Sequence, residues 1–247
     1  DKIIEKSLHL FPIREGILWN MYWRLENLGD RTYVAKNPEY GTYINYYLDH
    51  TPNNPIEIKI LDAKNNLITS LKDENPKKGI NRVVWDLSYD SANPLNLNKN
   101  DKVENKKIKP GKTYEGLSEE IRPKVAPGKY KARLSYNNVT EYSEILVSGD
   151  YRIKMPVENY KLKSEALVYL RDLQNRTHEL IENIVFIENQ LEQLAIKLKI
   201  VSSKGLSEIE NLHDRINNFK EDNLMRPPPS MGYRQKPRLK EEIKTLM

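Results

Sequence analysis

The chain has 247 residues, of which 38% are hydrophobic and 30% charged, and its 40 basic and 35 acidic side chains give a formal net charge of +5. Because it contains no cysteine, it cannot form a disulfide framework, a thiol nucleophile, an iron–sulfur cluster or a cysteine-based zinc site. No apolar run approaches the roughly 18–20 residues that a helix needs to cross a bilayer, so we expect no membrane span.

The beginning of the chain is rich in aromatic side chains. It starts at Asp1, and the residues that follow lack the basic and apolar regions of a signal peptide. We therefore interpret the chain as a mature, processed protein or as part of a longer one. We interpret residues 1–36 as an aromatic linker.

Residues 37–149 contain short runs of β-forming residues separated by turn residues. Ile56–Ile60 alternates apolar with charged side chains, which is typical of a half-buried strand. Asn137-Asn138 suits a tight hairpin because Asn tolerates a positive φ. The predicted strands are Tyr43–Leu48, Ile56–Ile60, Leu67–Leu71, Asn81–Leu87, Lys129–Tyr136 and Glu141–Val147. Because no helical pattern lies between them, they predict a β-sandwich.

Residues 88–126 interrupt this pattern of short strands and turns. They are rich in Asn, Lys and Pro, and residues 93–112 contain almost no large apolar side chain. A loop of this length inside a compact domain is typical of a functional or a mobile segment, and we favour a mobile one.

Residues 150–247 change to a helical period. Apolar residues spaced alternately four and three apart predict a coiled-coil helix, whose seam is Ala166, Leu170, Leu173, Thr177, Leu180, Ile184, Ile187, Leu191, Leu194 and Leu198. A break at residues 202–205 is followed by a second amphipathic stretch, with Ser207 and Glu210 spaced as a capping box. The short connection favours an antiparallel hairpin. Arg226-Pro227 ends the second helix, and a short helical piece follows Pro237.

Catalytic and metal-binding motifs are absent from the sequence. The four histidines share no metal-ligand spacing, and no HExxH, phosphate-binding loop or GxSxG occurs. Asp86 and Asp90, beside Trp85, are a candidate carboxylate pair, but on a strand they would lie roughly 13 Å apart, too far to act together. We expect Asp86 to close the strand end by bonding turn amides. We thus expect no catalytic residue, no metal and no cofactor, and no enzymatic activity of this chain by itself.

The aromatic residues near the start are the candidate binding residues. Trp19, Tyr22 and Trp23 cluster beside Arg24. These residue types are enriched in the hot spots of protein interfaces, and aromatic rings also stack on sugars. Three interpretations stay open: packing of a sheet or an interdomain seam, a protein-partner interface, or a glycan platform. The positive charges are spread along the chain and match no nucleic-acid-binding pattern, so we expect no nucleic-acid partner.

Several stretches are similar to a known family, and the Gly79–Asp86 and Pro127–Tyr130 pieces agree with it in order and spacing as well. They are Leu10–Arg14, Asn37–Leu48, Ile56–Lys64, Lys78–Leu87, Ala126–Tyr130 and Tyr233–Leu239. Together they resemble the C-terminal region of secreted bacterial sortilin-type β-propeller proteins, which are also described as BNR-repeat or glycosyl-hydrolase-like. Glu39 and Thr42 depart from the Asn-Pro-Pro-Tyr-Gly-Ala pattern of that family.

The resemblance implies an Ig-like or fibronectin-like β-sandwich over residues 37–149, followed by an antiparallel, coiled-coil-like helical hairpin over residues 150–247. It also implies a bacterial protein exported to the periplasm, cell surface or exterior. The partner would be a β-propeller domain of the same or another chain.

Our hypothesis is a non-catalytic scaffold and protein-interaction region. The alternatives are a carbohydrate-binding accessory module, or part of a glycoside hydrolase whose catalytic residues lie in a propeller. No propeller Asp-box repeat occurs in this chain, so no catalytic residue can be transferred from the family.

Overall fold

The computed structural model of the protein describes residues 3–20, 38–96, 122–201, 205–226 and 236–247. The chain divides into two compact units. The β unit comprises Asp1–Asp90 with Arg122–Ala166, and the helical unit comprises Ser91–Ile121 with Leu167–Met247.

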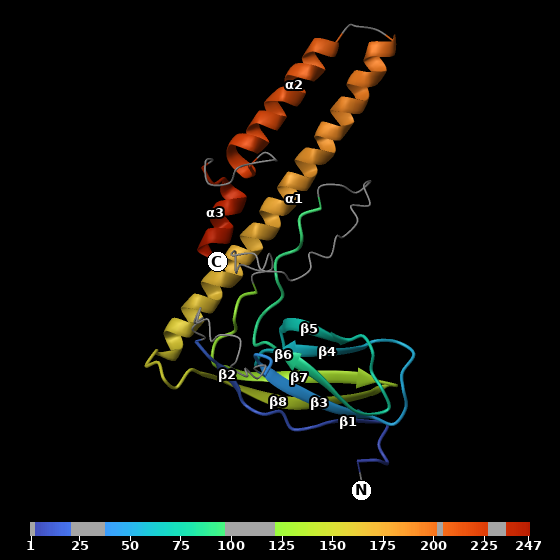
Figure 1. The fold of residues 1–247 in the computed structure, drawn as a ribbon, viewed down its shortest axis with the longest axis vertical. Helices are drawn as coiled ribbons and strands as arrows, with labels where there is room; N and C mark the ends of the chain where they lie inside the picture. Colours follow the sequence, from blue (N-terminus) through green and yellow to red (C-terminus); the bar gives the residue numbers. More distant parts are fainter. Residues whose placement is uncertain (1–2, 21–37, 97–121, 202–204, 227–235) are drawn as a thin grey trace, which may run out of the picture. The chain divides into compact units, whose positions relative to one another are not determined.

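The described strands of the β unit form two sheets (Figure 1). The three-stranded sheet has the order β1 (Leu8–Leu10), β3 (Thr42–Leu48) and β6 (Gly79–Trp85). The five-stranded sheet has the order β2 (Gly16–Leu18), β8 (Val139–Gly149), β7 (Gly128–Tyr136), β4 (Ile56–Leu61) and β5 (Leu67–Asp73). All described pairs are antiparallel except β2 with β8, which is parallel.

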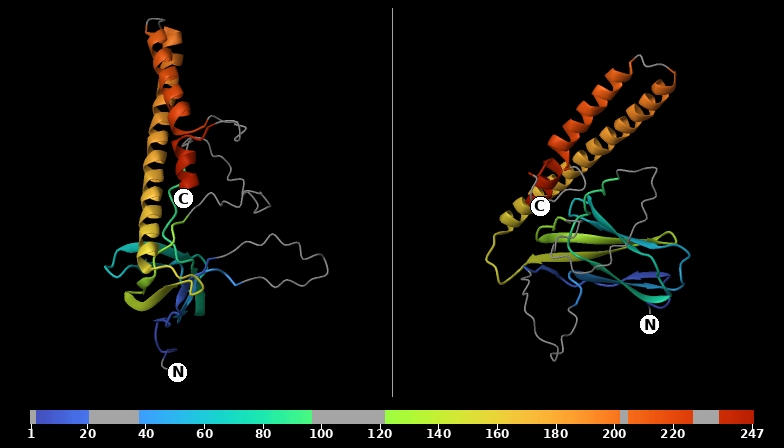
Figure 2. Two further views of the ribbon diagram at one scale, coloured as in Figure 1. Left: turned by 90° about the vertical axis from the view of Figure 1, so that its left-hand side faces the viewer. Right: turned by 45° about the horizontal axis from the view of Figure 1, so that its top comes forward.

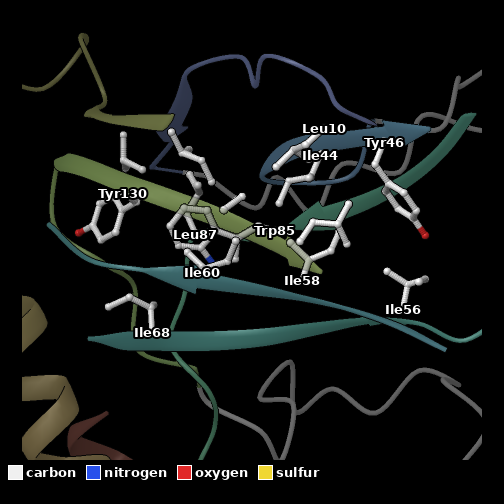
Figure 3. Close-up of a cluster of buried hydrophobic side chains, with 14 of the residues drawn as sticks. Leu10, Ile44, Tyr46, Ile56, Ile58, Ile60, Ile68, Trp85, Leu87 and Tyr130 are labelled. Atoms are coloured by element: carbon white, nitrogen blue, oxygen red, sulfur yellow. The ribbon is translucent and has the colours of Figure 1, made fainter. Parts of the chain in front are cut away.

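Both sheets contribute one face to a single buried core, shown in Figure 3. In β3 every second residue from Thr42 to Leu48 is buried, which is the burial pattern that an alternating strand predicts. The core residues that the strands contribute include Leu8, Leu10, Ile44, Tyr46, Ile58, Ile60, Trp85, Tyr130, Ala132, Leu134, Ile145 and Val147. The predicted strands are therefore confirmed, with small shifts at their ends.

Two short strands, β1 and β2, lie in the part of the chain that we interpreted as a linker. Each has three residues, too few to give a periodic signal. The predicted hairpin between β7 and β8 is confirmed: Asn137 and Asn138 have φ values of 46° and 63°, as a type I′ turn requires.

The helical unit contains most of α1 (Val157–Val201), which crosses from the β unit, together with α2 (Leu206–Phe219), the π-helical turn η1 (Lys220–Leu224) and α3 (Leu239–Leu246). Figure 2 shows α1 and α2 running antiparallel beside one another. Ion pairs join them at two levels, Lys199 with Glu210 and Lys220 with Glu188. No helix in the described ranges is long and apolar enough to cross a membrane.

The predicted seam of α1 is only half correct. Thr177, Ile184 and Leu191 lie on the buried or half-buried face of the helix, whereas Leu180 and Ile187 are more than two-fifths exposed. The reason is that α1 meets one antiparallel helix, and the contact is centred about one residue further along the chain, on Ile181 and Glu188.

The predicted capping box at the start of α2 is wrong. The helix begins at Leu206, preceded by Gly205 with a φ of 86°. Ser207 therefore lies inside the first turn, where its hydroxyl donates to Glu208 instead of capping the helix. The stop at the end of the second helix is confirmed, because η1 ends at Leu224, two residues before Arg226-Pro227.

Residues 93–96, from the predicted mobile segment, are bonded to α1. Asn93 donates its N–H to the Asn175 side chain over 2.7 Å, and its carbonyl oxygen lies 2.7 Å from His178 Nδ1. Asn96 donates its N–H to Glu182 over 2.9 Å. One face of α1 thus binds the backbone of Asn93 and Asn96. The remainder of the predicted mobile segment, from residue 97 to residue 121, lies outside the described residues.

The coarse prediction, a β-sheet part followed by a helical part, is confirmed by these elements. The finer classes, an Ig-like or fibronectin-like sandwich and a coiled-coil hairpin, belong to the proposal below.

Candidate functional site

Trp19, the first candidate binding residue, lies directly after β2. Because β2 pairs in parallel with the end of β8, Leu18 lies opposite Gly149. In a parallel pair the chain leaves both strands at the same edge of the sheet. This edge therefore brings Trp19 and Asn20 beside residues 150–152.

Asp150 fixes the local backbone. Its buried carboxylate accepts the Asn20 N–H over 3.0 Å and the Arg152 N–H over 3.0 Å. The Arg152 guanidinium binds both carboxylate oxygens, at 2.8 and 2.6 Å, and also donates to the Asn20 carbonyl oxygen over 3.2 Å. The bidentate guanidinium is the main reason why the pKa of Asp150 lies well below its usual range.

The rings of Trp19 and Tyr151 contact each other beside the Asp150–Arg152 ion pair. The Trp19 and Tyr151 rings meet edge to face, with centroids 5.3 Å apart and planes at 79°. The Arg152 guanidinium carbon lies 5.1 Å from the centre of the Trp19 ring, which is cation–π range. We name Trp19, Asn20, Asp150, Tyr151 and Arg152 the Trp19 cluster.

The Trp19 cluster presents the Tyr151 ring and the Arg152 guanidinium to solvent, whereas Trp19 is half-buried. Tyr151 is 77% exposed, and the Arg152 side chain is 55% exposed although it is fully engaged by Asp150. A surface of Trp, Tyr and Arg with a fixed backbone loses little conformational freedom when it binds. These side chains are therefore suited to binding a partner molecule.

Of the predicted binding residues, only Trp19 can be placed. Tyr22, Trp23 and Arg24 lie outside the described residues. The sequence analysis missed Tyr151 and Arg152. The sequence Asp150-Tyr151-Arg152 directly after a strand could have marked these residues as binding candidates. The parallel pairing that brings them to Trp19 was not predictable, because β2 has only three residues.

The expectation for Asp86 and Asp90 was wrong in its geometry. β6 ends at Trp85, and Leu87 has a φ of 59°, so these two acids do not continue one strand. Both carboxylates reach one guanidinium: Arg122 lies 3.3 Å from Asp86 and 3.8 Å from Asp90.

Asp86 does close the strand end, but through side chains. It accepts the Ser88 hydroxyl, and Lys124 donates to its carbonyl oxygen over 2.8 Å. The Lys124 amine also lies 4.5 Å from the centre of the Tyr40 ring. Burial lowers the pKa of Lys124, and burial, aided by the charge of Asp86, raises the pKa of Tyr40 to about 12. This is an internally paired network that joins the strand end to residues 122–124.

Two tyrosines of β3 pack within the β unit, in line with the first of the three interpretations of the aromatics, since Asp73 belongs to β5 of the other sheet and Arg82 to the neighbouring strand β6. Tyr46 is fully buried, and its hydroxyl donates to Asp73 over 2.6 Å. Tyr43 lies under the Arg82 guanidinium, 4.9 Å from it. Tyr151, in contrast, is exposed beside the half-buried Trp19.

Among the described residues, no three His, Asp or Glu side chains gather as a metal site would require. Comparisons of the chain with protein families, curated proteins and solved structures found no match.

Proposed function

We propose that this chain is the non-catalytic scaffold and protein-interaction region of an exported bacterial β-propeller protein, and that the Trp19 cluster contacts the propeller or another partner. The observation that carries the proposal is the Trp19–Tyr151 ring pair, with Tyr151 exposed and Trp19 half-buried, on a backbone fixed by Asp150. Trp, Tyr and Arg are the residue types that dominate binding energy in protein interfaces.

We also propose that the β unit is an Ig-like or fibronectin-like sandwich and that α1 and α2 form a coiled-coil-like hairpin. The residues that carry the family resemblance support the first part, because they occupy structural positions. Gly79 opens β6 with a φ of 98°, and Trp85 at its end is fully buried. Gly128 opens β7, and the Tyr130 hydroxyl donates to the Ala126 carbonyl oxygen over 2.7 Å.

The proposal is tested on the native protein. An antibody against this region would be used to purify the protein from extracts and exported fractions of its source, without denaturation. We expect a β-propeller in the purified material, either in one polypeptide far larger than 29.0 kDa or as a bound second chain. A protein of 29.0 kDa that is retained in the cytoplasm without a propeller would contradict both export and the propeller partner.

A carbohydrate-binding accessory module is the second candidate, favoured by the exposed ring of Tyr151. Its face is free to stack on a sugar, whereas Arg152 lies against the ring of Trp19. Affinity electrophoresis in soluble polysaccharides tests this. Retardation that is lost in Tyr151→Ala would support the glycan platform, and unretarded migration across a broad panel would exclude it.

A further inference from the structure

The outer face of the five-stranded sheet carries a row of cations along β7. In this strand the buried core residues alternate with basic ones. Because successive side chains of a strand point to opposite faces, the three basic residues lie together on the outer face: Lys129, Lys131 and Arg133. The register places Arg133 opposite Tyr142 of β8 and opposite Lys59 of β4.

An open hollow of about 480 Å³ lies on this face. It is lined by Lys131 and Arg133 of β7, by Tyr142 and Glu144 of β8, and by Asn65 from the turn after β4. Sites for small ligands have volumes of roughly 300–1,000 Å³. The hollow is therefore large enough to receive a group the size of a sugar ring.

The two cations in the hollow have no partner among the described residues. Lys131 and Arg133 are half-buried, and no ion pair or hydrogen bond in the described part of the chain engages either side chain. The Tyr142 ring is 60% exposed, and no described ring or cation stacks on it. Since a guanidinium binds a planar oxyanion through two parallel, charge-assisted hydrogen bonds, Arg133 is suited to hold an anionic group.

Cations outnumber acids on this face. The outward positions of β4, β5, β7 and β8 carry Lys59, Lys72, Lys129, Lys131 and Arg133 against Glu57 and Glu144. The turn between β4 and β5 adds one charge of each sign, Asp62 and Lys64. At the β2 edge, Glu15 accepts the Ser148 hydroxyl. The positive charge that remains favours a negatively charged ligand.

Glu144 distinguishes between kinds of anion. Its exposed carboxylate lies opposite Lys131 and lines the same hollow. It would repel the closely spaced phosphates of a nucleic acid, whereas it can accept hydrogen bonds from sugar hydroxyls. The exposed Tyr142 ring offers an apolar surface on which a sugar ring can stack. These side chains therefore match a sugar that carries both hydroxyls and a carboxylate.

A second hollow, of about 560 Å³, lies further along the same two strands. It is lined by Glu57 of β4 and Ser135 of β7, among others. Ser135 follows Lys131 by four residues, about 13 Å along the strand at roughly 3.3 Å per residue. Two hollows in succession suit consecutive residues of a polymer better than one small molecule.

We propose that the outer face of the five-stranded sheet binds a carboxylated polysaccharide. The Arg133 guanidinium holds a sugar carboxylate, Tyr142 stacks on a sugar ring, and Glu144 accepts sugar hydroxyls. This surface does not include the Trp19 cluster, so the inference does not rest on the function proposed above.

Calorimetric titration of the full chain with polygalacturonate tests the proposal. It is carried out at about 150 mM salt, where the Debye length of about 8 Å screens general attraction between a basic protein and a polyanion. We expect binding of polygalacturonate and none of neutral dextran. Tyr142→Ala, which leaves the charge unchanged, should raise the dissociation constant by about 10-fold or more. Arg133→Lys keeps the charge but loses the planar guanidinium, and should raise it by a similar factor.

Matched controls come from α1. Tyr169 is 65% exposed and Arg176 is exposed, so Tyr169→Ala and Arg176→Lys make the same two changes away from the strands. Each should alter the dissociation constant by less than about 2-fold. Circular dichroism of all four variants checks that the fold is retained.

Four outcomes would overturn the proposal. They are a lack of binding to polygalacturonate, equal affinity for polygalacturonate in the wild type, Tyr142→Ala and Arg133→Lys, and equal affinity of the wild type for polygalacturonate and single-stranded DNA. The fourth is binding that persists in Tyr142→Ala but is lost in Tyr151→Ala, which would assign the polysaccharide to the Trp19 cluster.

Discussion

The ion pair between Glu188 and Lys220 provides a quantitative test of how α1 and α2 are held together. Glu188 Oε2 and Lys220 Nζ lie 2.6 Å apart, and the side chains are only 10% and 15% exposed. Lys220→Met keeps most of the side-chain volume but leaves the carboxylate without its cation. Removing one member of a buried pair costs about 3–5 kcal/mol, and we expect about 3 kcal/mol here because both side chains retain some contact with water.

The matched control is the second ion pair between the same helices. Lys199 Nζ and Glu210 Oε1 lie 3.2 Å apart, but these side chains are 58% and 51% exposed. Lys199→Met should cost no more than about 0.5 kcal/mol, since exposed pairs contribute little. The double variant Glu188→Leu with Lys220→Met should return to within about 1 kcal/mol of the wild type, because it removes both buried charges.

Urea unfolding measures these differences. Circular dichroism at 222 nm follows mainly the helices, whereas tryptophan fluorescence follows the β unit through Trp19 and Trp85. The loss in Lys220→Met should appear in the circular dichroism transition. Equal costs for Lys220→Met and Lys199→Met would refute the argument that burial, and not proximity alone, sets the contribution of each pair.

Three further predictions concern the β unit. Gly41→Ala would drive a Cβ into the Trp85 carbonyl oxygen at a φ of 129°, so we expect its melting temperature to fall far more than that of Gly79→Ala, where φ is 98° but no atom lies within 4 Å. Tyr40, with its pKa raised to about 12, should ionise late in an ultraviolet titration; its contribution to stability should be complete below pH 10 and lost as the pH rises through about 12. Asp150, with its pKa lowered mainly by Arg152, should stabilise the fold above its unfolded pKa and lose that contribution as the pH falls through the folded value, so Asp150→Asn should show a weaker acid dependence of unfolding.

Strand prediction succeeded where one face of a strand is buried. The alternation in Ile56–Ile60 corresponds to a strand whose Ile58 and Ile60 are fully buried. Burial of one face requires apolar residues at every second position, and this makes the strand recognisable in the sequence. β1 and β2 have three residues each and owe their structure to pairing with distant strands. Pairing of this kind leaves no local trace, so the position of Trp19 beside Tyr151 could not be predicted.

Helix prediction succeeded for the period but not for the orientation. A heptad pattern identifies two adjacent apolar rows, but which row is buried depends on where the neighbouring helix crosses. In α1 the contact with α2 is centred near Glu188, so Ile184 is buried and Ile187 is exposed. The geometry of Asp86 was missed for a similar reason, because the positive φ of Leu87 ends the strand early and reflects tertiary packing of that buried side chain.

The central claim is that the Trp19 cluster is a contact surface for a partner. The most direct measurement is a calorimetric titration of this chain with the β-propeller identified in the native protein, comparing the wild type with Tyr151→Ala. Tyr142→Ala is the matched control, since Tyr142 is a 60% exposed tyrosine of β8 outside the cluster. The account predicts a dissociation constant raised about 30-fold or more by Tyr151→Ala and changed less than about 2-fold by Tyr142→Ala. Equal affinities for all three proteins would contradict it.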